Sequence, residues 1–414
     1  MPFAYKGLTI GLYSDLDVRG RLVLLRLDLN SPLDSAGMIL DDTRFRMHSG
    51  IVKALVDEGA RLVVIAHQGR PGDSDFTRLE RHAEVLSKVS GVPVGFVDDV
   101  IGPEARRRIR ALGPGEVLLL DNVRLLSEEY MRADMETHAS TIFATTLASL
   151  VDYYVNDAFS VSHRSQASIV GIPLLVPSVA GPLMHLEVEK LGIALEASLR
   201  PKVLVIGGAK LDDAVTMIRQ MIEAGNVDVV LTTGLVSLLF HAAKGTRLPS
   251  HVRTLLEKRG ASRIIDEARQ LLAGPVPVKL PVDYRVEADG SVRVEPADAI
   301  TGWPKDVGPA TVDEYREVIR EARVVVYRGP AGVIEEKQFR EGTISLVRAG
   351  LESGAFTILG GGHFNSILRE IPEEIKERVG HISSGGGAMV AFLTGRPLPG
   401  LVALGESYKR FMAG

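Results

Sequence analysis

The sequence predicts an α/β protein with two Rossmann-like, doubly wound parallel-sheet lobes that are joined by a hinge helix. Short apolar runs alternate with amphipathic helical segments along both halves of the chain, and this alternation is typical of parallel sheets covered on both faces. Near the middle, residues 182–195 carry apolar side chains at helical spacing, and Pro201 bars that helix from continuing into the next strand. We therefore predict an N-terminal lobe over 1–180, a hinge helix within 181–199 and a C-terminal lobe over 200–396.

The individual elements follow from the same periodicity. In the first half we expect strands at 22–29, 61–66, 94–97, 117–120 and 153–156, with helices at 46–58, 79–89, 103–111 and 134–150. In the second half we expect strands at 202–206, 227–232, 278–280, 324–327, 357–359 and 381–383. Helices are expected between them at 213–224, 236–244, 250–258, 263–272, 312–321, 336–349, 364–369 and 387–394.

Composition excludes several classes of protein. The chain has 414 residues, of which 45% are hydrophobic, enough for two or three domains with full cores. Its 48 basic and 52 acidic side chains give a net charge of -4, so nucleic acid is not an expected partner. The first residues lack the apolar core of a signal peptide, and no apolar run reaches the roughly 18 residues of a membrane helix. We expect a cytoplasmic protein without membrane contact, and the absence of cysteine excludes disulfides and thiolate ligands.

Arginines recur after the strands of the first half. Ligands of open α/β sheets bind beyond the carboxyl ends of the strands, and these ends are followed by Arg26, Arg44, Arg70, Arg124 and Arg164, with His67 among them. One such arginine would be a surface ion pair, but a converging set matches the paired oxygens of a small, multiply charged anion. The first lobe is therefore predicted to bind such an anion.

Glycines take these positions in the second half. They occur at 207–208, 234, 329–332, 360–362 and 385–387, and Lys210 follows the first pair. Glycine lets a phosphate or a flat base approach the backbone, and the free amides of a following helix favour anions. Tight turns between strands and helices are the alternative interpretation. The sequence contains no P-loop, dinucleotide fingerprint or protein-kinase loop, so a nucleotide site here would be of another kind. One lobe for a small anion, a second lobe for a nucleotide and a helix between them predict a small-molecule kinase that closes about its hinge.

The motifs at these strand ends resemble those of the phosphoglycerate kinase family, in particular its archaeal members, over essentially the whole chain. The resemblance rests on Arg-x-Asp-x-Asn, His-x-Gly-Arg-Pro, Asn-x-Arg, Asn-Asp-Ala-Phe, Gly-Gly-Ala-Lys, Gly-Pro-x-Gly-Val-x-Glu and Ser-x-Gly-Gly-Gly-Ala, which occur here at 26–30, 67–71, 122–124, 156–159, 207–210, 329–335 and 383–388. It implies reversible transfer of the acyl phosphate of 1,3-bisphosphoglycerate to ADP, giving ATP and 3-phosphoglycerate, with Mg²⁺ on the nucleotide. By the same analogy the final segment, 397–414, returns to the first lobe.

The resemblance also assigns residues. It implies that 3-phosphoglycerate is bound by Asp28, Asn30, Arg44, His67, Arg70, Arg124 and Arg164. For the nucleotide it implies Gly208, Lys210, Gly234, Glu335, Gly361, Gly362, His363 and Phe364. Catalytic roles would fall to Arg44 and Lys210, together with Gly386 and Gly387 beside the migrating phosphate.

Four positions depart from the common family pattern. Ala214 stands where a second lysine is usual, four residues after Lys210, and Arg328 stands where an asparagine is usual. His363 and Phe364 replace an aspartate and a threonine. Because that aspartate contacts magnesium in many members, the sequence assigns no metal ligand in the protein. With Ala214 at that position, the transition-state charge is expected to rest on Lys210, Arg44, magnesium and the amides of the glycine turns, unless another cation reaches the site.

Two other functions stay open on the sequence alone. One is a bilobal binding protein that captures an anionic metabolite without chemistry, and the other is a nucleotide-dependent kinase of a different small carboxylate. The absent signal peptide and the second, glycine-rich rim disfavour the binding protein. We expect a monomer that acts on small molecules.

Overall fold

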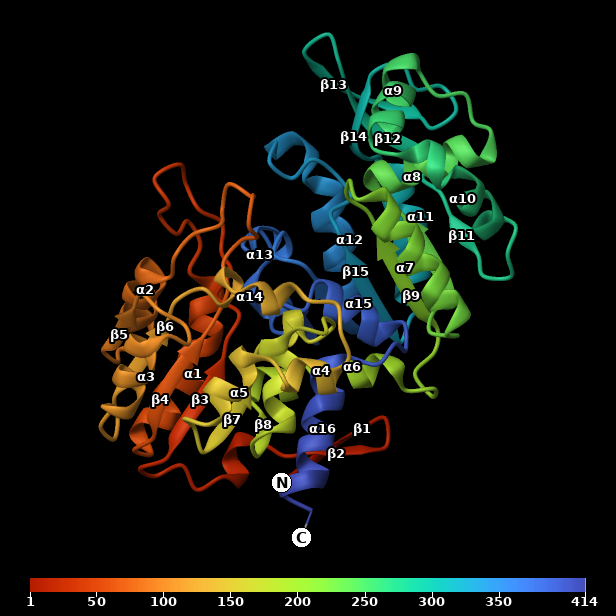
Figure 1. Ribbon diagram of the computed structural model, residues 1–414. Helices are drawn as coiled ribbons and strands as arrows, with labels where there is room; N and C mark the ends of the chain where they lie inside the picture. The colour runs from red at the N-terminus through yellow and green to blue at the C-terminus, as the bar shows by residue number, and fades with distance from the viewer. Residues whose placement is uncertain (414) are drawn as a thin grey trace. The chain divides into compact units, whose positions relative to one another are not determined.

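The computed structural model describes residues 1–413 and divides into two compact units (Figure 1). The first unit comprises Met1–Glu189 together with the C-terminal segment from Pro397, and the second comprises Lys190–Arg396. The helix α6 (Pro182–Leu195) begins in the first unit and ends in the second. Each unit contains a six-stranded parallel sheet with helices around it, which confirms the predicted fold class.

The sheet of the first unit has the strand order β5-β6-β4-β3-β7-β8. Its strands are β3 (Leu22–Arg26), β4 (Arg61–Ile65), β5 (Val94–Val97), β6 (Val117–Leu120), β7 (Tyr153–Asn156) and β8 (Ser178–Ala180). The helices are α1 (Thr43–Asp57), α2 (Glu80–Ser90), α3 (Pro103–Arg110), α4 (Met135–Ala139) and α5 (Ile142–Ala148). Every residue of β3 is buried, because helices cover both faces of the sheet.

Three expectations for this unit were wrong in detail. The first strand ends at Arg26 rather than at 29, and the chain then turns so that the Asn30 amide donates to the Asp28 carboxylate at 3.1 Å. The helix expected over 134–150 is two helices, because Thr141 is extended and its hydroxyl accepts from the Ala144 amide, capping α5. The hairpin of β1 (Phe3–Tyr5) and β2 (Leu8–Ile10) and the strand β8 were not predicted.

The sheet of the second unit has the order β11-β10-β9-β15-β16-β17. Its strands are β9 (Lys202–Ile206), β10 (Val229–Thr232), β11 (Val278–Lys279), β15 (Val324–Arg328), β16 (Phe356–Gly360) and β17 (His381–Ser383). Numbered along the chain within this sheet, the order is 3-2-1-4-5-6, as in dinucleotide-binding folds. Successive connections reverse direction between β9 and β15, so the ligand crevice is expected where these two strands end.

The helices of the second unit are α7 (Leu211–Glu223), α8 (Gly234–Lys244), α9 (Ser250–Lys258), α10 (Ile265–Leu272), α11 (Pro309–Arg320), α12 (Glu341–Glu352), α13 (Phe364–Leu368), α14 (Glu373–Lys376) and α15 (Gly387–Leu393). The helix expected from 336 begins at Glu341, after the short 3-10 helix at Lys337–Phe339. A three-stranded antiparallel sheet, formed by β12 (Asp283–Ala288), β13 (Ser291–Pro296) and β14 (Trp303–Val307), was missed. Its signal was present, because Asp289-Gly290 is a hairpin turn between alternating segments.

The C-terminal helix α16 (Pro399–Phe411) belongs to the first unit and packs beside β2 and β8 (Figure 1). The Leu398 amide donates to the Tyr5 hydroxyl at 2.9 Å, and the Ser407 hydroxyl donates to the Val176 carbonyl at 3.1 Å. Gly405 lies against Leu8, where an added Cβ would come within 2.8 Å of the leucine Cβ. Within residues 1–413 no helix combines the length and the apolar character that a membrane crossing requires.

The start of α6 depends on a buried carboxylate at the end of β7. Asp157 accepts hydrogen bonds from the amides of Leu183 at 2.7 Å and Met184 at 3.2 Å, which are free amides of the first helical turn. Its other oxygen lies 2.8 Å from Nδ1 of the buried His48. A Cβ on Gly181 would come within 2.3 Å of the same carboxylate. The helix therefore starts where Asp157 satisfies its first amides.

We expect Asp157→Ala to lower the free energy of unfolding of the first unit by about 3 kcal/mol, because it leaves two amides and an imidazole without their buried acceptor. Hydrogen exchange at the Leu183 and Met184 amides should accelerate in the variant. Asp57→Ala is the control, since Asp57 is exposed and within residues 1–413 its ion pair is with Lys53 alone. The free energy of unfolding of this variant should change by less than about 0.5 kcal/mol. Unchanged exchange in Asp157→Ala would contradict this account of the helix start.

Candidate functional site

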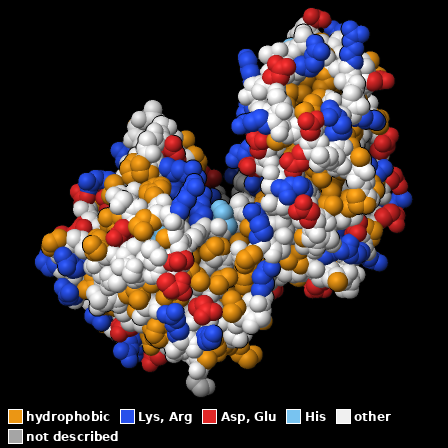
Figure 2. Space-filling model, turned by 45° about the vertical axis from the view of Figure 1, so that its right-hand side comes forward, with side chains coloured by type: hydrophobic (Ala, Val, Ile, Leu, Met, Phe, Trp, Pro, Cys, Tyr) orange, Lys and Arg blue, Asp and Glu red, His pale blue; other side chains and the backbone are white. Residues whose placement is uncertain are grey.

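Cations gather around His67 at the carboxyl edge of the first sheet. His67 follows β4 and is buried, and the charges of Arg26, Arg124, Arg164 and Arg44 all lie near enough to lower its pKa. Burial is the largest cause of that shift, which carries the pKa well below its ordinary 6.5. The predicted ring of arginines therefore does converge, and Figure 2 shows Lys and Arg side chains gathered on the body that holds this unit.

The tautomer of His67 is fixed by Arg26. Nη2 of Arg26 lies 3.1 Å from Nδ1 of His67, and a guanidinium only donates. Nδ1 is therefore the acceptor, and in the neutral ring the proton sits on Nε2. His67 thus offers one N–H donor without adding a charge to a cluster that is already strongly positive.

Arg26 itself serves the structure. It is fully buried, donates from Nε to the Ser168 hydroxyl at 3.2 Å and bonds the Leu27 carbonyl through Nη1. Ser168 in turn bonds the buried Glu129 through both its hydroxyl and its amide, at 2.6 and 2.9 Å. Burial lowers the pKa of Arg26 and raises that of Glu129. Arg26 therefore serves the structure as a fully buried side chain, and not as the surface ion pair that we had weighed against ligand binding.

Asp28 and Arg44, both expected to touch the substrate, form an ion pair with each other. Asp28 is almost fully buried, accepts from the Ser160 hydroxyl, and fixes the turn through the Asn30 amide. Arg44 keeps about a third of its side-chain surface exposed. Asp28 therefore orients the guanidinium, while Arg44 can still present free N–H groups to a ligand.

Asn30, Gly69 and Arg124 form a second part of this edge. The Asn30 carbonyl oxygen accepts from the Gly69 amide at 2.8 Å, and Arg124 donates through Nη1 to the Gly69 carbonyl. Nε of Arg124 is buried and has no hydrogen-bond partner within residues 1–413. Its guanidinium also lies 5.9 Å from the ring centre of Tyr130, a residue that sequence reasoning missed. A buried guanidinium N–H without an acceptor is energetically costly, and an anion oxygen is the kind of acceptor that it lacks.

Arg70 and Arg164 complete the set. Arg70 is exposed, whereas Arg164 is half-buried with Nε 3.5 Å from Nε2 of His163. Burial lowers the pKa of Arg164, and the positive charges of Arg70 and Arg26 lower it further. For Arg124, burial and the charges of Arg164 and Arg26 bring the pKa to about 10. The arginines remain charged near pH 7, so the edge holds repelling cations that an anion would relieve.

In the second unit, the glycines that follow β9, β10 and β15 pack against one another. The Gly207 amide donates to the Arg328 carbonyl at 2.8 Å, and the Gly208 amide to the Pro330 carbonyl at 2.9 Å. A Cβ on Gly207 would lie 2.3 Å from the Thr233 hydroxyl, and one on Gly234 would lie 2.9 Å from the Gly208 amide. These glycines are required for close backbone packing, which is the tight-turn alternative raised above.

The glycines that follow β16 and β17 are more open. Gly362 and Gly386 have no atom within 4 Å of where a Cβ would lie, and Gly361 and Gly386 have φ values of +120° and +49°. Gly386 and Gly387 begin α15, which has only seven residues. The space beside the backbone is thus open at these two turns, as the close approach of a phosphate requires.

The predicted nucleotide residues divide into exposed and buried groups. Lys210, Glu335 and His363 have exposed side chains. Phe364 is buried against Tyr327, with ring centres 6.3 Å apart, so its side chain belongs to the core rather than to the exposed edge. Ala214 is also buried, at 5% exposure.

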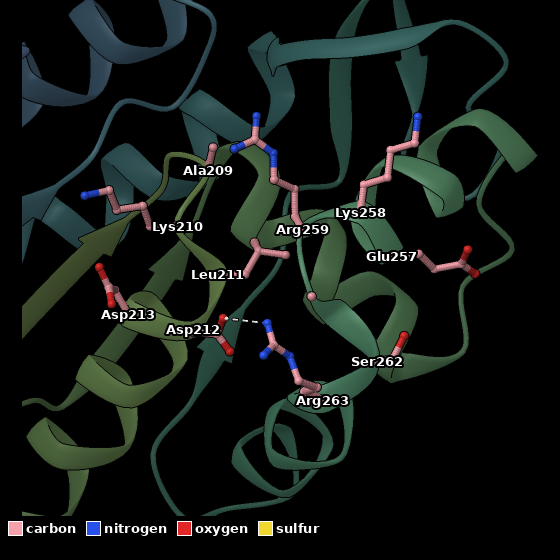
Figure 3. Close-up of a pocket in the computed structure, with 11 residues that line it drawn as sticks. Ala209, Lys210, Leu211, Asp212, Asp213, Glu257, Lys258, Arg259, Ser262 and Arg263 are labelled. Atoms are coloured by element: carbon pink, nitrogen blue, oxygen red, sulfur yellow. Dashed lines mark ion pairs between the residues drawn. The ribbon is translucent and has the colours of Figure 1, made fainter. Parts of the chain in front are cut away.

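A pocket of about 620 Å³ adjoins the Lys210 turn (Figure 3). It lies between the start of α7 and the segment 257–263, and sequence reasoning had not singled out its basic residues Lys258, Arg259 and Arg263. Arg263 pairs with Asp212 at 3.8 Å, and the Lys210 side chain extends away from Lys258 and Arg263 (Figure 3). Residues 1–413 contain no group of three or more His, Asp or Glu side chains that could hold a metal ion.

One sheet edge of clustered cations and one of accessible glycine turns define a phosphotransferase of the α/β class. The chain belongs to the phosphoglycerate kinase family, since the family model described as "Phosphoglycerate kinase" matches residues 13–396. It is 51% identical over 412 residues to the phosphoglycerate kinase of Aeropyrum pernix, with 99% of each chain covered. It is 46% identical over 400 residues to that of Saccharolobus solfataricus, covering 97% of this chain and 98% of the relative.

Solved structures agree with this assignment. The crystal structure of phosphoglycerate kinase from Pyrococcus horikoshii is similar with a TM-score of 0.89 and 35% identity, covering 96% of this chain and 99% of that one. The structure of phosphoglycerate kinase from Coxiella burnetii is similar with a TM-score of 0.74 and 29% identity, at the same coverage. The resemblance and the kinase class predicted from the sequence are confirmed.

The depressed pKa of His67 gives a testable pH dependence. The unfolded chain binds a proton on this ring below about pH 6.5 and the native state does not, so this group makes stability fall as pH drops below 6.5, by up to about 1.4 kcal/mol per pH unit. His67→Gln should make that decline shallower in urea unfolding followed by circular dichroism. Nitrogen NMR should show a neutral ring protonated at Nε2 at pH 6, and a ring titrating near 6.5 would contradict the assignment.

Proposed function

We propose that the chain transfers the acyl phosphate of 1,3-bisphosphoglycerate to ADP, giving ATP and 3-phosphoglycerate, and catalyses the reverse reaction. The observation that carries this proposal is the cluster of arginines around a neutral His67. Such a cluster suits a small acid that bears both a carboxylate and a phosphate. The two accessible glycine turns of the second unit support nucleotide binding there. No feature favours a binding protein without chemistry or a different carboxylate substrate.

In the first unit, we propose that Asp28, Asn30, His67, Arg70, Arg124 and Arg164 surround 3-phosphoglycerate. We propose that substrate oxygens accept from the Nε2 proton of His67 and from Arg124, whose buried Nε has no hydrogen-bond partner within residues 1–413. Asp28 acts mainly by holding Arg44 and the Asn30 turn. A guanidinium held in this way can stabilise charge on the transferring phosphoryl group.

In the second unit, we propose that Lys210 and the turns at Gly361, Gly362, Gly386 and Gly387 hold the nucleotide phosphates. We propose that Glu335, which is exposed after β15, contacts the ribose; His363 is exposed beside the Gly360–Gly362 turn. Gly208 and Gly234 allow the close packing on which that edge depends. The Phe364 side chain takes no part, because it is buried.

Mg²⁺ enters with ADP or ATP as part of the substrate and neutralises phosphate charge. We assign no residue of this chain as a ligand of this ion, because His363 stands at the position where the family commonly has a carboxylate. The Asp212 and Asp213 carboxylates at the start of α7 are the acidic groups nearest in sequence to Lys210. The protein's contribution is therefore to position the phosphates, to exclude water and to supply fixed donors.

The assay that tests this function is ATP formation from 1,3-bisphosphoglycerate and Mg-ADP by the purified chain. Arg44→Ala should lower kcat by roughly a hundredfold or more, while the Kd for Mg-ADP changes less than about threefold, because Arg44 acts on the transferring group. Arg46→Ala is a matched control on the same helix, because Arg46 is exposed and its one ion pair among the described residues is with Asp42. An inactive wild-type chain refutes the function, and an Arg44→Ala variant with normal turnover refutes the role of that residue.

The reaction requires donor and acceptor in line and shielded from water, so we propose that the two units close on each other about α6 when both substrates are bound. Small-angle scattering should give a smaller radius of gyration with 3-phosphoglycerate and Mg-ATP together than with neither. Each substrate alone serves as the control. Equal radii in all four samples would contradict closure.

A further inference from the structure

Arg328 is a cation at the reversal point of the second sheet that the site described above does not use. It is the last residue of β15, and its neighbours across the sheet are Ile206 at the end of β9 and Gly360 at the end of β16. The strand order reverses between β9 and β15, and such points form the ligand crevice of doubly wound sheets. Arg328 therefore lies at the rim of the expected nucleotide crevice.

The contacts of Arg328 leave most of its donors available. Nη1 donates to the Gly360 carbonyl at 3.3 Å, and the same nitrogen lies 3.4 Å from where a Cβ of Gly361 would be. Arg328 has no carboxylate within ion-pair distance among residues 1–413. A guanidinium carries five N–H groups, so one weak bond to a carbonyl anchors this side chain above the Gly360–Gly362 turn without saturating it.

Arg328 and Tyr327 lie on opposite faces of the sheet. The neighbouring Tyr327 points towards α12, where its hydroxyl donates to the Leu346 carbonyl at 2.6 Å. Successive side chains of a strand alternate between faces, so Arg328 points to the opposite face. There the Asp213 carboxylate, on the first turn of α7, opposes the lowering of the Arg328 pKa that burial causes. Arg328 thus extends between the start of α7 and the Gly360–Gly362 turn.

The same region lacks a cation at Ala214. Ala214 lies one helical turn after Lys210 and is buried, so the face of α7 beside Lys210 adds no positive charge. Lys210 alone would face the several negative charges of a nucleotide. The half-buried Arg328 approaches the same turn from the adjacent strand, and its partial burial strengthens its interaction with an anion relative to an exposed lysine.

We infer that Arg328 binds the terminal phosphate of ADP or ATP and supplies the charge that Ala214 does not. This inference rests on the proposed function and adds a residue to its nucleotide site. It implies that Arg328 discriminates nucleotides by their phosphates and contributes little to binding of the nucleoside. The competing candidates are Lys258, Arg259 and Arg263 of the pocket in Figure 3, which are exposed.

The test is titration calorimetry of the full-length chain with Mg-ADP and, separately, with adenosine. Arg328→Ala should weaken Mg-ADP binding by roughly 10- to 100-fold, as expected for loss of a charge-assisted hydrogen bond, and should leave adenosine binding within about twofold. Arg328→Lys should recover part of the affinity for Mg-ADP. Arg323→Ala is the matched control, because Arg323 is exposed and lies just before the other end of β15.

The outcomes are separable from those of the proposed function. If the wild type makes ATP from 1,3-bisphosphoglycerate but Arg328→Ala binds Mg-ADP as the wild type does, the inference is overturned and the function stands. A comparable loss in Arg259→Ala, with none in Arg328→Ala, would assign the phosphate to the pocket instead. If Arg328→Ala fails to bind adenosine, the same two titrations are made on Arg328→Gln, which keeps a polar side chain and removes the charge. Mg-ADP binding as tight as that of the wild type would then overturn the inference.

Discussion

The first unit depends on one buried carboxylate. Asp157 satisfies the first amides of α6 and also bonds Nδ1 of His48, whose Nε2 accepts from the Asp28 amide at 3.3 Å. Both histidine bonds are made by the neutral ring with its proton on Nδ1. The loop that carries Asp28, and with it the orientation of Arg44, is therefore tied to the start of the helix that leads into the second unit. Glycine is required at position 181, because a Cβ there would collide with the Asp157 carboxylate.

Around this support the first unit accumulates charge that its own fold does not neutralise. Glu129 and Asp28 are the buried carboxylates near the cluster, and Glu129 is engaged by Ser168. The neutrality of His67 limits the repulsion, since a protonated ring would add one more charge in a poorly solvated place. Under the proposed function, a multiply charged anion bound at this edge would offset the repulsion among the arginines. The proposed affinity for the substrate would then come from the positive charge that the fold of this unit gathers.

Sequence reasoning could predict the two parallel sheets, apart from β8, and the residues at their edges, because periodicity and strand ends are local properties. It could not predict that Arg26 donates a hydrogen bond to Ser168. The two residues are 142 positions apart, and only the tertiary fold brings them together. Nor could it separate Gly207 and Gly234, which pack against other backbone, from Gly362 and Gly386, which do not. Phe364 follows a glycine turn in the same way as a ligand-contacting residue would, and only packing against Tyr327 shows that it belongs to the core. Tyr130 belongs to none of the motifs, so nothing in the sequence signals its position beside Arg124.

The carboxyl edges of the two parallel sheets also differ in how many positively charged side chains they carry. The first gathers several half-buried or buried guanidinium groups, whereas the second relies on backbone amides, the exposed Lys210 and the half-buried Arg328. Tight binding of substrate and transition state alike would lower KM without raising kcat, and slow release of ATP would then limit turnover. If the nucleotide binds at the second edge as proposed, backbone amides and one anchored guanidinium would place donors where charge shifts during transfer. The cation that ends β15 would then take the place of the one that Ala214 does not supply, so the edge would keep a second positive side chain beside Lys210.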